Sequence, residues 1–390
     1  MSSLAIGMVG KALKRNIPLS VQLDLTYRCN ERCIHCYLDH NDHGEMTTAE
    51  IKDLLDQMAD AGVFYLTLSG GEILTRRDFF GILEHARLRT FCIKLKTNGV
   101  LIRKLEADRI KTLGVESVQI SIYSHRHEVH DAITKRPGSL RRSIEAVRLL
   151  REQGLHVIMA NVLMSQNVND YRGVRELAGE LGAQFIVDPT ITPMMDGDRS
   201  ILDLNVDEAA LQEVFRNEAL VGNVEEFCTP PQGADEDALD MLPCSAGHTA
   251  CYVSPYGDVY PCVQFPLPSG NVRRTKFADI WRDSPQLKEV RSITLRDMPS
   301  CSRCIHGGTC TRCPGLAYLE GNMRGPSVQD CEKSYARTGI ASENLKSKKA
   351  AALTVPILQL VQIQIQGSGP SAPRLSSDVS GSVPEVRVTC

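Results

Sequence analysis

Residues 27–37 read YRCNERCIHCY, and their three cysteines, Cys29, Cys33 and Cys36, have the spacing C-x3-C-x2-C. They follow Val21–Leu25, an alternating apolar run that is typical of a half-buried strand, so the thiols lie on a loop that leaves a strand. Thiols this close together cannot all form disulfides, and they suit a metal or a cluster. An iron–sulfur cubane takes four cysteine ligands, so three local ligands would leave one iron open to another group.

A zinc site is the alternative interpretation of this stretch. Cys29, Cys33 and Cys36 together with His40 form a Cys3His set, which zinc accepts. The short motif alone leaves both interpretations open.

Composition limits the class of protein. The chain has 390 residues, of which 42% are hydrophobic and 23% charged, and this predicts a soluble globular protein of two or three domains. A net charge of -3 gives no electrostatic case for nucleic acid or a membrane surface. Fourteen cysteines without an export signal predict a cytoplasmic protein that uses its thiols as metal ligands.

Residues 21–195, after a lead-in of residues 1–20, alternate strand and helix patterns. The predicted strands are Val21–Leu25, Tyr65–Ser69, Cys92–Thr97, Ser117–Tyr123, His156–Met164 and Phe185–Ile191. The predicted helices are Thr47–Ala61, Arg76–Arg87, Leu101–Leu113, Leu140–Gln153 and Asp170–Leu181. Six such units predict an α/β fold with a parallel sheet, either open or curled into part of a barrel.

Polar motifs follow several of these strands. Gly70-Gly71-Glu72 comes after the second strand, Asn98 after the third, and Ser121 lies within the fourth. The carboxyl ends of barrel strands carry active sites, so these motifs and the cysteine loop are expected at one rim. Two glycines let a backbone approach a ligand closely, and a carboxylate can accept hydrogen bonds from an ammonium group.

The cysteine loop with an aromatic residue, His35, before the last cysteine resembles the cluster motif of the radical S-adenosylmethionine enzymes. The resemblance implies a partial (β/α)6 TIM-like barrel and a [4Fe–4S] cluster whose open iron holds S-adenosylmethionine. It also implies cofactor-binding roles for matching residues. These are Gly70, Gly71 and Glu72 for the amino group, Asn98, Ser121 for the ribose, and Arg142 for the carboxylate.

A second cysteine region begins after a bridge at residues 196–243. Ala250–Cys262 is expected to form a hairpin with its turn at Pro255–Asp258. Two C-x2-C pairs, Cys301/Cys304 and Cys310/Cys313, are on their own typical of a zinc ribbon. The region's cysteines are Cys244, Cys251, Cys262, Cys301, Cys304, Cys310, Cys313 and Cys331.

Over residues 244–342 the pattern resembles the SPASM extension, a small cysteine-rich domain of peptide-modifying radical enzymes. The resemblance implies two auxiliary [4Fe–4S] clusters, hence three clusters in all. The implied ligand sets are Cys244, Cys251, Cys262 and Cys313 for one, and Cys301, Cys304, Cys310 and Cys331 for the other. Two residues instead of the usual three separate Cys310 from Cys313, and Val263 stands where sulfatase maturases carry a catalytic aspartate, which argues against that activity.

The resemblance implies a peptide maturase, similar to the pyrroloquinoline quinone peptide cyclase group. Reductive cleavage of S-adenosylmethionine would yield a 5′-deoxyadenosyl radical that takes hydrogen from a ribosomally made precursor peptide. The expected partners are that peptide, a flavodoxin- or ferredoxin-type electron donor, and a separate winged-helix protein that binds the leader. No catalytic acid or base stands out, and residues 343–390 are expected to form a disordered tail that includes Cys390.

Two rival functions remain at this point. One is a radical enzyme that acts on a small molecule, such as a tetrapyrrole side chain. The other is a non-catalytic zinc-binding interaction module, which explains the C-x2-C pairs but not the six strand–helix units.

Overall fold

One sheet runs through the part of the chain that the computed structural model describes, residues 3–228 and 233–347. Its strand order is β6-β5-β4-β3-β2-β1-β7-β8-β9. The first six strands are β1 (Ser20–Asp24), β2 (Tyr65–Ser69), β3 (Cys92–Thr97), β4 (Ser117–Ser121), β5 (His156–Val162) and β6 (Gln184–Asp188). The other three are β7 (Ala250–Val253), β8 (Asp258–Tyr260) and β9 (Gly270–Asn271).

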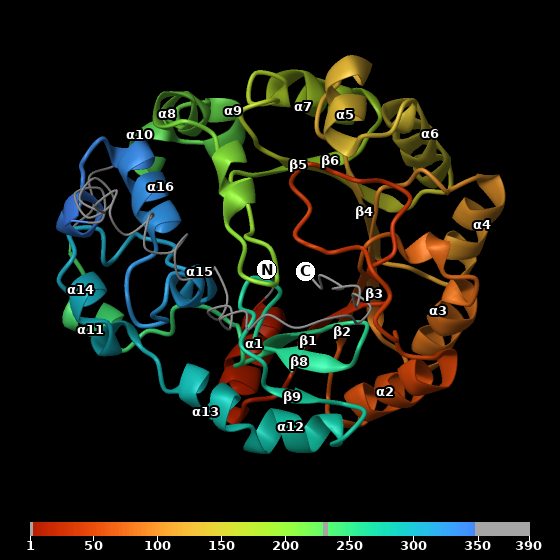
Figure 1. Ribbon diagram of the computed structural model, residues 1–390, viewed down its shortest axis with the longest axis horizontal. Helices are drawn as coiled ribbons and strands as arrows, with labels where there is room; N and C mark the ends of the chain where they lie inside the picture. The colour runs from red at the N-terminus through yellow and green to blue at the C-terminus, as the bar shows by residue number, and fades with distance from the viewer. Residues whose placement is uncertain (1–2, 229–232, 348–390) are drawn as a thin grey trace, which may run out of the picture. The chain divides into compact units, whose positions relative to one another are not determined.

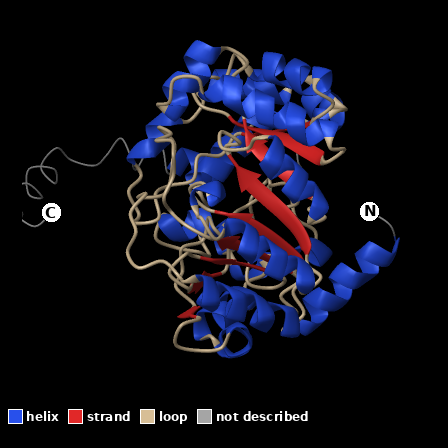
Figure 2. Ribbon diagram, turned by 90° about the vertical axis from the view of Figure 1, so that its right-hand side faces the viewer, coloured by secondary structure: helices blue, strands red, loops and turns tan. Residues whose placement is uncertain are grey.

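The order of β1 to β6 answers the question between an open sheet and a barrel wall. Each of these strands pairs in parallel with the next one along the chain. An open doubly wound sheet would reverse its strand order at a switch point, whereas a barrel wall adds strands in sequence. Figure 1 shows these strands following one another, and Figure 2 shows helices lying outside the strands. The wall is therefore that of a partial (β/α)6 barrel.

The helices that connect these strands cover the outer side of the wall (Figure 1). They are α2 (Thr48–Asp60), α3 (Phe79–Leu88), α4 (Lys104–Thr112), α5 (His127–Thr134), α6 (Ser139–Glu152) and α7 (Tyr171–Glu180). The strands alternate, and β3 is the clearest case: Ile93 and Leu95 are buried in the core, while Lys94 and Lys96 point to the other face. The barrel interior is therefore polar.

Local signals explain where the elements begin and end. The capping box predicted at Thr47 is present, with the Thr47 hydroxyl and the Glu50 carboxylate each accepting a hydrogen bond from the other residue's backbone N–H. Gly62 ends α2 with a φ of 94°, a conformation that glycine adopts without strain. The predicted strands and helices of the barrel are all found, with ends that shift by up to three residues.

Some elements were not predicted. Residues 1–20, expected only as a lead-in, include α1 (Ser3–Arg15), and α5 fills a segment where the sequence pattern predicts no helix. In the bridge, α8 (Glu208–Phe215) forms together with three single-turn helices. These are α9 (Glu218–Val221), α10 (Val224–Phe227) and α11 (Glu236–Leu239). Single turns carry too little periodicity to be detected in a sequence.

The second cysteine region is joined to the barrel sheet. Strands β7 and β8 form the predicted antiparallel hairpin, and β7 also pairs in parallel with β1, with Ser20 opposite Ala250. Its helices include α12 (Phe277–Asp283), α13 (Pro285–Arg291), α14 (Pro299–Ser302), α15 (Pro314–Leu319) and α16 (Val328–Thr338). Phe277 and Trp281 belong to the same hydrophobic core as the barrel strands. The sheet and core therefore cross the predicted boundary between residues 21–195 and 244–342.

Among the described residues, no helix combines the length and apolar character that a membrane crossing requires. The tail predicted at residues 343–390, with Cys390, lies outside the described residues from position 348 onward.

Candidate active site

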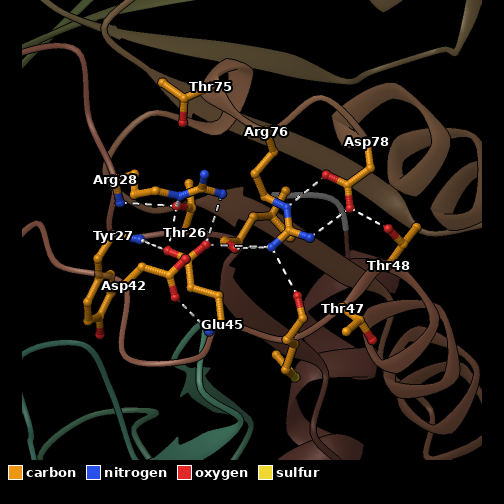
Figure 3. A network of polar contacts seen from close by, with 12 residues as sticks. Thr26, Tyr27, Arg28, Asp42, Glu45, Thr47, Thr48, Thr75, Arg76 and Asp78 are labelled. Carbon is orange, nitrogen blue, oxygen red and sulfur yellow. Dashed lines mark hydrogen bonds and ion pairs between the residues drawn. The ribbon is translucent and has the colours of Figure 1, made fainter.

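The three-cysteine loop leaves β1 and is anchored at its start by buried charged side chains (Figure 3). Arg76 donates hydrogen bonds to the carbonyls of Leu25 (2.9 Å) and Met46 (3.1 Å), and its side chain is 6% exposed. Glu45 accepts from the hydroxyl of Thr26 at 2.6 Å and from the backbone N–H of the next residue at 2.9 Å. The backbone that leads into Cys29 is therefore fixed from both sides.

The two glycines of the predicted GGE motif pack directly on this backbone. A Cβ at Gly70 would lie 2.3 Å from the Thr26 carbonyl oxygen, and one at Gly71 would lie 2.5 Å from that of Arg28. The Gly71 N–H donates to the Thr26 carbonyl at 2.7 Å. Only glycine fits such an approach. These glycines bring the loop after β2 against the cysteine loop, in addition to lining the cavity described below.

Glu72 is fully buried, and its carboxylate is occupied by the protein itself. It accepts from the Thr97 hydroxyl (2.7 and 2.8 Å), the Asn98 N–H (2.8 Å) and the Leu74 N–H (3.0 Å). Burial raises the pKa of Glu72 above its ordinary value, and these hydrogen bonds oppose that rise. In this geometry Glu72 ties the loops after β2 and β3 together and does not line the cavity.

The three thiols open into one cavity of about 290 Å³ inside the rim of the barrel. Asn98 and Ser121 line it, as do both glycines. The Asn98 amide donates to Cys29 Sγ at 3.8 Å and to Asn30 Oδ1 at 2.6 Å. The loops after β1, β2 and β3 and the end of β4 therefore converge at the rim, as the sequence predicted.

Arg142 is not brought to this cavity. It lies exposed on α6, and it is absent from the cavity wall. The arginine that approaches the loop is instead Arg136, whose guanidinium donates to the Asn30 carbonyl at 2.6 Å. Arg142 lies in a helix whose rotation the sequence does not give, and Arg136 lies in the loop before that helix, so the sequence pattern does not show which of them reaches the cysteine loop.

The cavity fits a cluster and a polar ligand better than a single metal ion. No three His, Cys, Asp or Glu side chains in the described ranges lie close enough together to hold one ion, which disfavours the zinc set with His40. A cubane is wider than one ion, and its thiolates lie further apart. In the described structure the buried ring atoms His35 Nδ1 and His40 Nδ1 have no hydrogen-bond partner, and both residues line the cavity. Such atoms suit a bound polar ligand.

Electrostatics of the loop are dominated by burial. Burial raises the pKa of the Cys29 thiol to about 12, and it raises those of Cys33 and Cys36 as well. The thiols therefore keep their protons unless bound iron replaces them.

Glu31, which sequence reasoning missed, is buried beside the Ser139 hydroxyl, and burial raises its pKa to about 7. Its position inside the cysteine motif was the available signal.

All eight cysteines of the second region line another cavity, of about 690 Å³. The carbonyl of Gln264 lies 2.3 Å from where a Cβ at Gly315 would be, so glycine is required at the start of α15. None of the thirteen described cysteines forms a disulfide.

The thiols in this cavity divide into two groups by their mutual influence. Burial is the largest cause that raises the pKa of Cys244, Cys251, Cys301, Cys310, Cys313 and Cys331, and neighbouring thiols raise these pKa values further. The neighbours link Cys244, Cys251, Cys262 and Cys313 in one group. They link Cys301, Cys304, Cys310 and Cys331 in the other. This grouping has the membership that the resemblance implied for two cubanes, and the ligand assignment itself remains a prediction.

The two cavities share part of their walls. Gln22 of β1 and the pair Val263 and Gln264, which follows Cys262, line both. Lys96 of β3 lines the first cavity and influences the pKa of Cys262 through its charge. Sequence reasoning did not select Gln22, Lys96 or Gln264, although the alternation of β1 and β3 placed the first two on the polar face.

Comparison with protein families identifies two regions. The family model described as "Radical SAM superfamily" matches residues 23–178, and the SPASM model, described as "Iron-sulfur cluster-binding domain", matches residues 244–305. Together these matches contain the cysteine loop, the glycine motif and the hairpin.

Curated relatives and solved structures extend the likeness. The AdoMet-dependent heme synthase of Methanosarcina barkeri is 28% identical over 327 residues, covering 78% of this chain and 93% of that protein. Mycofactocin maturase MftC of Mycobacterium tuberculosis is 28% identical over 342 residues, covering 84% and 86%. The crystal structure of Streptococcus suis SuiB bound to precursor peptide SuiA has a TM-score of 0.66 at 19% identity, covering 84% of this chain and 79% of that one. The last comparison shows a common fold.

Proposed function

We propose that this chain, which belongs to the radical SAM superfamily and carries a SPASM domain, is an enzyme that modifies a ribosomally made precursor peptide. When bound, S-adenosylmethionine and the iron–sulfur cluster at Cys29, Cys33 and Cys36 supply a radical able to take hydrogen from an unactivated carbon. The protein's own contribution is to bind, orient and enclose these groups and the substrate.

The shared wall of the two cavities is the observation that carries the proposal. Gln22, Val263 and Gln264 separate a cavity lined by three thiols from one lined by eight. A substrate carbon held in the first cavity therefore lies next to the cavity that the eight cysteines line. If those eight thiols hold two clusters, the clusters could accept an electron from the substrate across the shared wall.

Within the first cavity the residues have distinct parts in the proposal. Gly70 and Gly71 present backbone to the cofactor's amino group, and Asn98 and Ser121 face the same space. Glu72 holds the loops after β2 and β3 in place through its three partners, and it acts on the cofactor through them. The carboxylate-binding role implied for Arg142 has no support in its exposed position.

We favour a peptide over a tetrapyrrole because the eight-cysteine extension resembles that of peptide-modifying radical enzymes, although one relative is a heme synthase and another a mycofactocin maturase. We include in the proposal a cytoplasmic location, a flavodoxin- or ferredoxin-type electron donor and a separate leader-binding protein.

The first test is elemental analysis of protein purified without oxygen. Three cubanes require about twelve irons and about twelve sulfides per chain with little zinc. Stoichiometric zinc without iron would refute the radical mechanism. Cleavage of S-adenosylmethionine by the reduced enzyme is then measured with synthetic precursor peptides and with a carboxylated porphyrin. Cleavage stimulated by a porphyrin, but by none of the peptides encoded beside this gene, would select the small-molecule alternative.

A further inference from the structure

Lys96 occupies an unusual place for a lysine. Its side chain points from β3 into the barrel interior and lines the first cavity, two residues before Asn98. Asn98 contacts Cys29, so the Lys96 ammonium lies one layer deeper than the cysteine loop on the same face of the strand. Burial lowers the pKa of Lys96, because the surrounding protein disfavours its charge.

A chain of hydrogen bonds holds this ammonium in position. Lys96 Nζ donates to Gln22 Oε1 at 3.0 Å, and Gln22 Nε2 donates to Asp24 Oδ1 at 3.2 Å. Asp24 is fully buried and also accepts from the Tyr252 hydroxyl at 2.9 Å. The glutamine is thereby fixed with its oxygen toward the lysine, and the hairpin strand β7 supports the arrangement through Tyr252.

No carboxylate of the described residues forms a direct ion pair with Lys96. Asp24, Cys262 and Asp188 stabilise its charge only from a distance, and Gln22 supplies its one described hydrogen bond. A buried ammonium is unfavourable unless a partner compensates its charge. Perturbed charges of this kind are concentrated at sites where a ligand supplies the partner. Lys96 lines the cavity, where a ligand could supply that partner.

We propose that Lys96 binds a carboxylate of the peptide substrate and thereby determines which residue is presented for reaction. The inference rests on the proposed function, since it assumes that a peptide occupies this cavity. The carboxylate has two possible sources, an Asp or Glu side chain or the peptide's C-terminus. Gln22 acts as a positioning residue, because it acts through Lys96.

The test compares Lys96→Met and Lys96→Arg with a matched control, Lys94→Met. Lys94 lies on the same strand and face, but it pairs with Glu116 at 4.0 Å and does not line the cavity. Iron content and S-adenosylmethionine binding are measured first, so that a variant with damaged sites is recognised. Lys96→Arg keeps the charge and reports whether charge or shape is needed.

Binding is measured anaerobically by NMR line broadening, because reduced iron–sulfur clusters are paramagnetic. Three pairs of probes are used, each a carboxylate and its amide. Acetylated, amidated pentaalanine with a central Glu or Gln tests a side-chain carboxylate, and pentaalanine with a free or an amidated C-terminus tests the C-terminus. Glutarate and glutaramide test a small molecule. The wild type is expected to bind one carboxylate source about 10- to 100-fold more tightly than its amide twin, the range for a charged hydrogen bond. Lys96→Met should lose this preference, whereas Lys94→Met should keep it.

Each other result has a definite meaning. No carboxylate preference in the wild type, or a preference that survives Lys96→Met, overturns the inference. Weaker S-adenosylmethionine binding by Lys96→Met with the preference intact would assign the lysine to the cofactor and overturn it as well. A Lys96-dependent preference for glutarate with no binding of any peptide would support the carboxylate site and refute the peptide as substrate class.

Discussion

Replacing Gly71 with alanine tests whether the glycine motif is built for contact with the cysteine loop. The new Cβ would lie 2.5 Å from the Arg28 carbonyl oxygen and 2.6 Å from that of Tyr27, and both are backbone atoms that cannot swing away. Relief requires the two loops to separate. Separation would break the hydrogen bonds from Gly71 N to Thr26 O (2.7 Å) and from Glu72 N to Arg28 O (3.0 Å).

The magnitude follows from these contacts. Overpacking costs about 1–3 kcal/mol, and two hydrogen bonds are worth about 1 kcal/mol each, so Gly71→Ala should lose roughly 3–5 kcal/mol of stability. Because the displaced backbone carries Cys29, the first cluster site should lose iron while the eight-cysteine region keeps it. Denaturant unfolding and iron analysis of anaerobically purified protein measure both effects.

A matched control comes from α3. A Cβ at Gly81 meets nothing within 4 Å, and alanine is favoured over glycine in a helix by roughly 0.5–1 kcal/mol. Gly81→Ala should therefore be neutral or stabilising with full iron content. If Gly71→Ala matched Gly81→Ala in stability, iron and S-adenosylmethionine binding, the account of the glycine motif as a contact between loops would be refuted.

Three further predictions use other parts of the site. Burial raises the pKa of Asp24 to about 6, above its unfolded value of 3.8. The protonated form therefore favours folding, and stability falls as the pH rises through 6. Unfolding measured from pH 5 to pH 7 should show a loss of roughly 1 kcal/mol in the wild type and no such loss in Asp24→Asn. Arg76→Met breaks a buried charge cluster and should cost about 3 kcal/mol or more, whereas the exposed control Arg282→Met should leave the denaturation midpoint unchanged. Cys262→Ala and Cys331→Ala should each remove about four of about twelve irons, and a loss of all iron from either variant would contradict two separate sites.

The sequence predicted the barrel strands well because each signal was local. The alternation of β3 and the capping box at Thr47 depend on residues within one element, and both are found. The convergence of Cys29, Gly70 and Asn98 also followed, since the ends of parallel strands meet at one edge.

The remaining features depend on contacts between distant segments. The motif predicts that Glu72 binds an ammonium group, and this stays a prediction; the orientation of its carboxylate depends on Thr97 and Asn98, which lie more than twenty residues away in the sequence. The position of Arg142 depends on the rotation of α6, and that of Lys96 on the depth of the cavity. The periodicity of the sequence gives neither the rotation of α6 nor the depth of the cavity.

The pairing of β1 with β7 has a consequence for how the protein is made. Ser20 lies beside Ala250, a partner that the ribosome adds about 230 residues later. At roughly 5–20 residues per second, one edge of β1 waits on the order of 10–50 s for its neighbour during synthesis. Until then that edge offers unpaired N–H and C=O groups to any other nascent chain. The amount of protein that stays unaggregated in a cell should therefore depend on chaperones and on slow expression. It should be lowest for truncated chains that end before β7.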